Sequence, residues 1–308
     1  MSMNMIPTEV IKFGGTLMGN AETILDSARF VRDASQISRV VVVVSATRGT
    51  TNVLSDISDN ISTHNHDEAQ QCIREFFDRH VQIVEDLELS SGQQAYLAEI
   101  LYGAVEQLNL YAKSYVLKPP MRDYILSLGE YISSYIFTEA LQKVGLRESE
   151  QVDAYKIIKT DSSFGEAKPD LLKSVENIQS IILPKLIEGR TVVTPGFYGI
   201  DGNGFTTTMG RNTSDMTGAI IAYGLHADRL ILCKGVSGIF DNDPIIHGDA
   251  RLCEELTYDE AAEIARSGGR VIHHEIMSLL EERDIPALVM DPRTPEMGTR
   301  IGRSKEVA

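Results

Sequence analysis

Two adjacent glycines beside a lysine, near the N-terminus, form the first group of residues whose types could do chemistry. The segment Lys12-Phe13-Gly14-Gly15-Thr16 closes a short apolar run that begins at Val10. Glycines let backbone N–H groups approach a phosphate closely, and a lysine supplies the point charge that a transferring phosphoryl group needs. A tight turn between a strand and a helix, with a solvated lysine, would use the same residues, so this segment alone supports either interpretation.

A threonine-rich run at residues 206–215 is the second signal, and it leads directly into a predicted helix at residues 214–225. Hydroxyl and N–H groups at a helix N-terminus favour an anion, and Arg211 can hold a carboxylate through two parallel hydrogen bonds. Ser214 or Asp215 could also serve as an ordinary helix cap. Capping does not explain three threonines, a glycine and an arginine in one run, so the pattern favours anion binding.

The third signal is Ser127-Leu128-Gly129-Glu130, which places a glycine inside a long predicted helix at residues 121–144. A glycine there costs up to about 1 kcal/mol relative to alanine, and a close approach of another segment could justify it. Glu130 could then receive an ammonium group. Taken alone, the better interpretation is a solvated carboxylate beside a glycine that serves packing.

A mainly parallel α/β sheet is predicted to position these residues. Residues 10–13 and 40–44 are β-branched apolar runs typical of buried strands, and residues 21–37 between them have the apolar spacing of a helix. Such a strand–helix–strand order begins a parallel sheet. Further strands are predicted at residues 154–159, 191–194, 229–233 and 287–290. Further helices are predicted at residues 67–87, 93–111, 171–187 and 273–283, and a capping box of Thr257 and Glu260 starts one more.

The composition limits the domain organisation and the partners. The 308 residues carry no linker-like tract or repeat, so we expect one domain over residues 1–308 in two lobes, divided near residues 206–215. A formal net charge of -15 and a sequence pI near 4.9 argue against a large surface for nucleic acid or for an anionic membrane. The N-terminus lacks a signal-peptide pattern and no stretch has the apolar length of a membrane span. We therefore expect a cytoplasmic protein.

No metal site built from protein side chains is expected. Cys72, Cys233 and Cys253 are widely spaced and odd in number, which fits a reducing compartment better than a zinc site. The pairs His64-x-His66 and His273-His274 come without carboxylates or cysteines at ligand spacing, so they are predicted to be surface histidines.

The three chemical segments, in this order and at these separations, resemble the aspartate kinase branch of the amino acid kinase family. The most specific element is Thr-Thr-x-Gly-Arg-x-x-Ser-Asp at residues 207–215. The resemblance spans nearly the whole chain and implies a three-layer sandwich with a mainly parallel central sheet. It also takes in Val43-Val44-Ser45-Ala46 with Thr51-Asn52, Lys159-Thr160-Asp161 with Phe164-Gly165, Pro195-Gly196-Phe197, and Gly298-Thr299.

The resemblance implies a transfer of the ATP γ-phosphoryl group, with Mg²⁺ held mainly by the nucleotide phosphates, to the side-chain carboxylate of aspartate. Lys12 would stabilise the transferring group together with N–H groups around Gly14 and Gly15, and Asp215 would organise the cationic residues. In the pocket for the amino acid, residues 1–205 would supply most of the contacts. There Glu130 would bind the ammonium group, Arg211 a carboxylate, and Ser45, Thr51, Phe197 and Ser214 would complete the pocket.

The nucleotide side, assigned to residues 206–308, departs from the pattern of this branch. Where aspartate kinases usually carry Thr-Asp-Val-Asp-Gly, this chain has Lys234-Gly235-Val236-Ser237-Gly238, and a lysine at this point is similar to the uridylate kinase branch. The family's Ala-Lys-Val-Leu-His-Pro is replaced by residues 269–274, Gly-Arg-Val-Ile-His-His. The predicted nucleotide-binding residues are Lys12, Gly14, Gly15, Lys234, Gly235, Phe240, Asp243 and Arg270.

Two alternatives to an aspartate kinase stay open: a kinase of the same fold with another acceptor, and a ligand-binding relative without catalysis. The joint presence of Lys12, Glu130, Arg211 and Asp215 favours an enzyme over a binding protein, and the resemblance implies a role in amino-acid biosynthesis. The chain ends shortly after Gly298-Thr299, so no ACT regulatory domain is expected here, and no feedback inhibition by lysine or threonine. Any homodimer would then use the catalytic domain.

Overall fold

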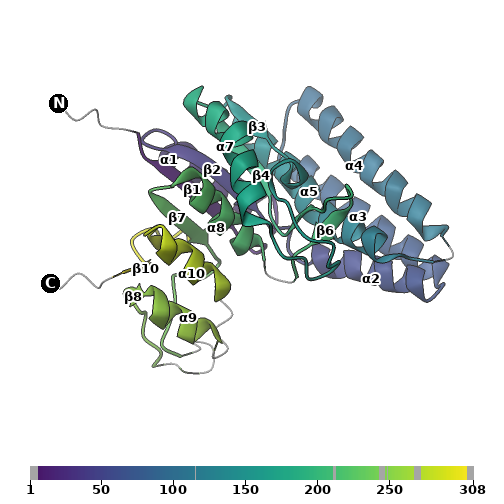
Figure 1. Cartoon of the computed structure of the whole chain (residues 1–308). Coiled ribbons are helices and arrows are strands. Elements are labelled where there is room, and N and C mark those ends of the chain that lie inside the picture. The colour runs from purple at the N-terminus through teal and green to yellow at the C-terminus, as the bar shows by residue number, and fades with distance from the viewer. Residues whose placement is uncertain are drawn as a thin grey trace.

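An eight-stranded sheet forms the centre of the computed structural model, which describes residues 6–114, 116–210, 213–242, 247, 249–266 and 272–303 (Figure 1). The strand order is β3-β4-β2-β1-β7-β9-β10-β8, and all pairs are parallel except β9 with β10. The strands are β1 (Thr8–Phe13), β2 (Arg39–Val44), β3 (Ser149–Gln151), β4 (Thr191–Pro195), β7 (Arg229–Cys233), β8 (Glu255–Thr257), β9 (Ala287–Met290) and β10 (Thr299–Gly302). A separate hairpin pairs β5 (Tyr198–Ile200) with β6 (Thr206–Thr208).

Helices cover both faces of this sheet, which confirms the predicted three-layer α/β fold. One face packs against α1 (Ala21–Ala34), α2 (Thr50–Ser62), α3 (His66–Asp86), α4 (Ser91–Ala112) and α5 (Pro119–Lys143). The other packs against α6 (Ala154–Ile157), α7 (Leu171–Ile187), α8 (Ser214–Leu225), α9 (Tyr258–Arg266) and α10 (Glu275–Glu282). Figure 1 shows α2 to α5 gathered at one end of the molecule and α9 and α10 at the other.

Strand alternation decides which core each side chain joins. In β2, Val40, Val42 and Val44 pack with the α1–α5 layer, and the two valines between them pack with the α8 layer. In β1, Val10 faces the α8 layer, and Lys12, two residues further along, shares that face. The pattern therefore directs the Lys12 side chain toward α8 without any special backbone geometry.

The chain reverses its strand order at β1, which lies between β2 and β7. In a doubly wound sheet, the carboxyl ends of the strands on either side of such a point border a crevice in which ligands bind. Here β1, β2, β4 and β7 end at one edge of the sheet. The residues that follow them are Gly14, Ser45, Gly196 and Lys234. Because the central sheet is continuous through β1 and β7, both predicted lobes contribute to this edge; the lobe boundary itself stays a prediction.

Most predicted elements are present, and the exceptions have local causes. The predicted strand at residues 154–159 is wrong: Asp153 accepts a hydrogen bond from the Tyr155 N–H at 3.2 Å and starts the short helix α6. The hairpin of β5 and β6 and the short strands β3, β8 and β10 were not predicted. The capping box is confirmed, since the Thr257 N–H donates to Glu260 at 2.8 Å and the Glu260 N–H donates to Thr257 at 3.2 Å.

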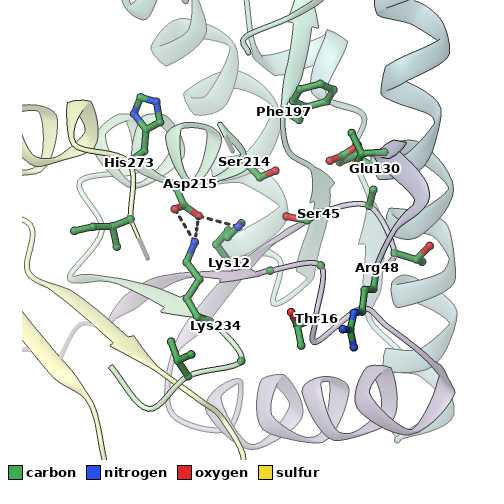
Figure 2. Close-up of a pocket in the computed structure, with 18 of the residues that line it drawn as sticks. Lys12, Thr16, Ser45, Arg48, Glu130, Phe197, Ser214, Asp215, Lys234 and His273 are labelled. Atoms are coloured by element: carbon green, nitrogen blue, oxygen red, sulfur yellow. Dashed lines mark hydrogen bonds and ion pairs between the residues drawn. The ribbon is translucent and has the colours of Figure 1, made fainter. Parts of the chain in front are cut away.

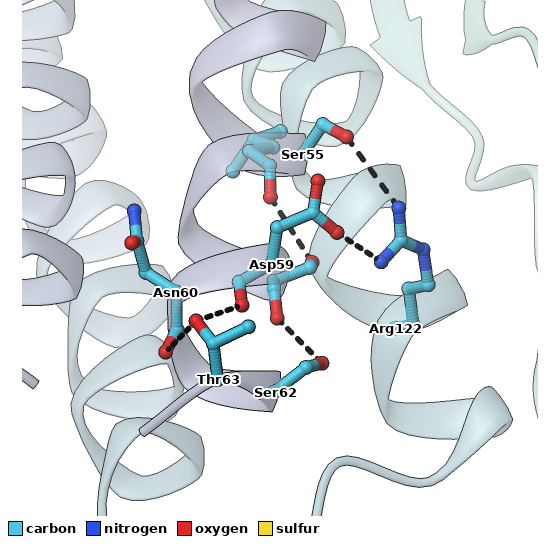
Figure 3. A network of polar contacts seen from close by, with 8 residues as sticks. Ser55, Asp59, Asn60, Ser62, Thr63 and Arg122 are labelled. Atoms are coloured by element: carbon cyan, nitrogen blue, oxygen red, sulfur yellow. Dashed lines mark hydrogen bonds and ion pairs between the residues drawn. The ribbon is translucent and has the colours of Figure 1, made fainter. Parts of the chain in front are cut away.

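Helix α2 was not predicted either, because its sequence is rich in Ser, Thr, Asn and Asp. Tertiary contacts hold it instead: Arg122 of α5 donates to Asp59 at 2.6 Å and to Ser55 at 3.5 Å (Figure 3). Its apolar side chains, Val53, Leu54, Ile57 and Ile61, are buried in the core.

Within the described residues, the helices include none long and apolar enough to cross a membrane.

Candidate active site

A cavity of about 890 Å³ lies at the carboxyl edge of the sheet. Its walls come from the loops that follow β1, β2 and β7, from Glu130 in the middle of α5, and from the first two residues of α8. Segments more than 200 residues apart in the sequence therefore face one space. Figure 2 shows their side chains directed toward it from different walls.

Two lysines share one carboxylate at the deep end of the cavity. Lys12 Nζ lies 2.8 Å from Asp215 Oδ1, and Lys234 Nζ lies 2.8 and 2.7 Å from the two Asp215 oxygens (Figure 2). Lys12 and Asp215 are almost fully buried, and the Lys234 side chain is 17% exposed. The cluster carries a net charge of about +1, since two cations face a single anion. It is therefore a buried cationic centre suited to an anionic ligand.

The electrostatics of this cluster follow from burial and close charges. Burial alone would raise the pKa of Asp215, but the charges of Lys12 and Lys234 hold it well below its usual range. Burial lowers the pKa of Lys234, and the charge of Lys12 lowers it further, while Asp215 opposes both effects. Gly218, three residues after Asp215, lies where α8 packs on β7 and β1: a Cβ there would lie 3.3 Å from Leu230 Cδ1, which is a tight contact, and 3.6 Å from Lys12 Cβ, which is an ordinary one.

Free backbone N–H groups lie beside the two lysines. The Gly14 N–H donates to the Cys233 carbonyl at 3.0 Å, which ties the β1 loop to β7. The Gly15 and Thr16 N–H groups have no hydrogen-bond partner among the described residues, and both residues line the cavity. A Cβ at Gly235 would lie 2.9 Å from Thr16 Cγ2, so glycine is needed where the β7 loop passes the β1 loop. Lysines and free N–H groups together form a site for phosphate oxygens.

Glu130 places a carboxyl group on the opposite wall (Figure 2). Its side chain is 4% exposed, the Ala46 N–H hydrogen-bonds to its carboxyl group, and its Oε2 has no partner among the described residues. Burial raises its pKa to about 8, although Ala46 and the charge of Lys12 oppose the shift. A buried acceptor that lacks a partner and faces a cavity is suited to an ammonium group. The solvated carboxylate expected from this segment alone is therefore wrong.

Gly129 makes the position of Glu130 possible. A Cβ at residue 129 would lie 2.8 Å from Ala46 Cβ and 3.2 Å from Thr50 Cγ2, so α5 packs directly on the loop after β2. This is the close approach that the glycine inside a helix suggested.

We expect Gly129→Ala to push that loop away from α5, destabilise the protein by about 1 to 3 kcal/mol and weaken binding at Glu130. Gly103→Ala in α4 is the matched control, because a Cβ there meets nothing within 4 Å and alanine should stabilise the helix by up to about 1 kcal/mol. Urea unfolding of both variants measures the difference. Equal stabilities for the two variants would contradict the packing argument.

The other predicted residues of the amino-acid pocket lie together around Glu130. Ser45, Thr51, Phe197 and Ser214 all line the cavity. Phe197 has φ +76°, a left-handed conformation rarely adopted by a bulky residue, and its N–H donates to Thr217 Oγ1 at 3.1 Å. Gly196 before it cannot carry a side chain, since a Cβ would lie 2.6 Å from Ser214 Cβ. This backbone conformation thus directs the Phe197 side chain toward the cavity, beside the start of α8.

The remaining predicted site residues have different outcomes. Phe240 is described but does not line it; it forms an isolated bridge with Leu252 instead. Arg211, Asp243 and Arg270 lie outside the described residues. Gly235 and Lys234 do line the cavity.

Sequence reasoning also missed some of the cavity wall. Thr16 and Arg48 belong to it, and so do His273 and His274, whose rings stack with centroids 5.2 Å apart. His274 is exposed and His273 half-buried, so both lie at the surface as predicted, but both also line the cavity. The only signal that could have found them was their position in the segment that replaces the family's Ala-Lys-Val-Leu-His-Pro.

Comparison with known proteins agrees with this geometry. The chain is 31% identical to the lysine-sensitive aspartokinase 3 of Escherichia coli over 291 residues, which cover 94% of this chain and 62% of the relative. It is also 31% identical to the chloroplastic aspartokinase 3 of Arabidopsis thaliana over 314 residues, which cover 98% of this chain and 54% of the relative. The chain thus spans less than two thirds of the length of these relatives.

A solved aspartokinase structure is also similar to this chain. The E. coli aspartokinase III complex with aspartate and ADP superposes with a TM-score of 0.88 at 29% identity, covering 97% of this chain and 65% of the other. Residues 7–291 match the sequence profile of the amino acid kinase family. With its parallel sheet, its cavity at the carboxyl edge and this match over most of its length, the chain belongs to the amino acid kinase family.

Proposed function

We propose that this chain is an aspartate kinase, which transfers the γ-phosphoryl group of ATP to the side-chain carboxylate of L-aspartate and forms 4-phospho-L-aspartate. One observation carries the proposal: a single cavity holds a buried two-lysine cluster on one wall and, on another, the buried Glu130, whose Oε2 has no partner among the described residues. Cationic and N–H groups suit the triphosphate, and Glu130 suits the ammonium group of an amino acid. The aspartokinase relatives, one of them solved with aspartate and ADP, support this acceptor.

The reaction needs no general base. The side-chain carboxylate of aspartate, with a pKa near 4, is already ionised at neutral pH and attacks the γ-phosphorus directly. A carboxylate oxygen–phosphorus bond forms as the bond from phosphorus to the β–γ bridging oxygen breaks, and ADP leaves with the electron pair. Lys12 and Lys234 neutralise the charge that develops on the transferring group, and the Gly15 and Thr16 N–H groups orient it.

Asp215 acts on the lysines and not on the substrate, because both of its oxygens already accept from lysine. It keeps two like charges close together in a buried site, where each alone would be expensive to hold. Glu130, Ser45, Thr51, Phe197 and Ser214 form the aspartate pocket. Arg211 remains the predicted partner of a substrate carboxylate, and Asp243 and Arg270 remain predicted for the nucleotide.

Magnesium is proposed to arrive with the nucleotide. Among the described residues, no three histidine, cysteine, aspartate or glutamate side chains are grouped to hold a metal ion. Triphosphate oxygens are ligands that Mg²⁺ prefers, so the protein needs to hold the complex mainly through the phosphates. A cytoplasmic location and a homodimer through this domain stay predictions.

An acceptor panel tests the proposal. Purified protein with Mg²⁺ and ATP should release ADP and form a hydroxamate with hydroxylamine when aspartate is present, because hydroxylamine traps an acyl phosphate. Glutamate, N-acetylglutamate, carbamate and uridine monophosphate serve as alternative acceptors. Turnover with one of these compounds and none with aspartate would show that this compound, and not aspartate, is the acceptor. Aspartate-induced thermal stabilisation without any turnover would favour a binding protein.

A further inference from the structure

The 45–51 loop comprises residues 45–49, which follow β2, together with Thr50 and Thr51, the first two residues of α2. It carries Ser45 and Thr51 of the proposed aspartate pocket, and α3 packs against the side of it that faces away from the cavity. Two consecutive residues of α3 make the contacts. Arg79 Nη1 donates to the Arg48 carbonyl at 2.6 Å, and His80 Nε2 lies 3.4 Å from Thr47 Oγ1. Neither α3 residue lines the cavity, whereas Thr47 and Arg48 do. The contacts therefore run from the helical layer to the back of the pocket wall.

The state of His80 follows from its surroundings. Its side chain is fully buried, and Nδ1 lies 2.7 Å from the Phe76 carbonyl. A carbonyl oxygen only accepts, so Nδ1 carries the proton. Burial, together with the nearby charge of Arg79, favours the neutral ring, and its pKa is lowered to about 4. Nε2 is then an acceptor that faces Thr47.

This tautomer sets the direction of a short chain of hydroxyl groups. Thr47 Oγ1 and Thr50 Oγ1 lie 2.5 Å apart, and either could donate to the other. With Nε2 as an acceptor, the Thr47 hydroxyl donates to His80 and the Thr50 hydroxyl donates to Thr47. Both threonines are almost fully buried. Thr47 lies two residues after Ser45, and Thr50 immediately precedes Thr51, so the chain fixes the segment between the two pocket residues.

We propose that His80 is a positioning residue for the acceptor pocket: through Thr47 and Thr50 it holds the 45–51 loop in the conformation that presents Ser45 and Thr51 to the amino acid. This inference rests on the proposed function. Phe76 satisfies Nδ1 within α3, whereas the buried acceptor Nε2 needs a donor, and the Thr47 hydroxyl of the loop supplies it. The bond to Thr47 is what links the core to the loop.

The test is a double-mutant cycle on the whole chain with His80→Leu, Thr47→Val and the pair together. Each single variant should raise the KM for aspartate about tenfold while kcat and the KM for ATP stay within about twofold, since only the acceptor loop loses its support. The pair should be no worse than Thr47→Val alone, because that change already removes the bond to His80 together with the bond to Thr50. His80→Gln, whose side-chain oxygen can accept from Thr47, should recover most of the affinity.

Two controls separate positioning from general damage. His66→Leu removes a histidine whose Nδ1 likewise contacts a backbone carbonyl, that of Ala112 at 3.0 Å, but far from the loop, so the KM for aspartate should not change. Thermal unfolding of every variant shows whether that variant is folded at the assay temperature. Should His80→Leu fail to fold, Thr47→Val alone decides the matter, as it only replaces a hydroxyl group by a methyl group of similar size.

The outcomes distinguish this inference from the proposed function. Equal increases in both KM values, additive effects in the pair, or wild-type KM values in the single variants would overturn the positioning role while aspartate turnover by the wild type stands. An absence of aspartate turnover in the wild type would instead overturn the proposed function, and this inference with it.

Discussion

Replacing Lys12 by alanine is expected to lower kcat by about 10²- to 10³-fold and to change aspartate affinity by no more than about twofold. The reason is that Lys12 faces Asp215 and the phosphate-binding loop, so its charge matters most when negative charge develops on the transferring phosphoryl group. Rapid-quench measurement of phosphoryl transfer, combined with calorimetric aspartate binding, separates the two effects. Equal losses of turnover and aspartate affinity would contradict the assigned role.

The fold should survive this change, because Asp215 keeps Lys234 as a partner at 2.7 Å. Lys12→Met, which keeps most of the side-chain volume, checks that the loss comes from charge and not from a cavity. Lys173→Ala serves as the control, since that lysine is exposed on α7 and, within the part of the chain that the structure describes, its ion pair is with Asp170, three residues earlier. Its kcat should equal that of the wild type.

Replacing Glu130 by glutamine is expected to weaken aspartate binding about 100-fold, because the substrate ammonium group would lose its buried anionic partner. The same change should stabilise the free protein. With a folded-state pKa of about 8 and an ordinary value of 4.5, Glu130 keeps a proton on folding that the unfolded chain has lost at neutral pH. The free energy that this group contributes to folding therefore becomes less favourable as pH rises from about 4.5 to about 8. Glutamine does not titrate, so the variant does not lose stability in this way.

The pH dependence of binding has the opposite sign. Below pH 8 the wild-type carboxyl group must release a proton before it can pair with the ammonium group, so aspartate affinity should rise about tenfold per pH unit up to about pH 8. Calorimetry without nucleotide, in buffers of different ionisation enthalpy, should show release of about one proton at pH 7. Omitting the nucleotide keeps Lys234, whose pKa is also shifted, out of the result.

Glu139→Gln provides the matched control for Glu130. This residue is another nearly buried glutamate of α5, and it does not line the cavity. Its substitution should leave aspartate affinity and proton release unchanged. If Glu130→Gln bound aspartate as well as the wild type, or if no proton were released at pH 7, Glu130 would not be the ammonium site.

Local patterns in the sequence were enough to predict the elements that carry most of the site. The valine run before Ser45, the Gly-Gly pair after Lys12 and the threonine-rich entry to α8 each report on short-range geometry, and the strands and helix were found where expected. Strand alternation even implies the face of Lys12. The predicted three-layer fold followed from the order of such elements together with the family resemblance.

What local patterns could not predict depends on packing between distant segments. Glu130 looked solvated because its burial results from Gly129 meeting Ala46, a contact made more than 80 residues away along the chain. The sharing of Asp215 by two lysines needs β1, β7 and α8 to meet. His80 and Thr47 were missed for the same reason, since a buried histidine and a loop threonine carry no motif.

The nucleotide side shows the limit of transfer by resemblance. Phe240 was assigned to the nucleotide from its place after the altered Lys234–Gly238 segment, yet it pairs with Leu252 and does not line the cavity. His273 and His274 do line it. Where the segment departs from the family's residues, position in the sequence no longer predicts position in space.

A crystal structure of the protein with aspartate and Mg·ADP is the most direct test of the account. It should place the aspartate ammonium group within hydrogen-bond distance of Glu130 Oε2, the side-chain carboxylate toward Lys12, and the ADP phosphates beside Gly14, Gly15 and Lys234, all in one cavity. An aspartate ammonium group bound elsewhere, or ADP phosphates outside the reach of both lysines, would contradict it.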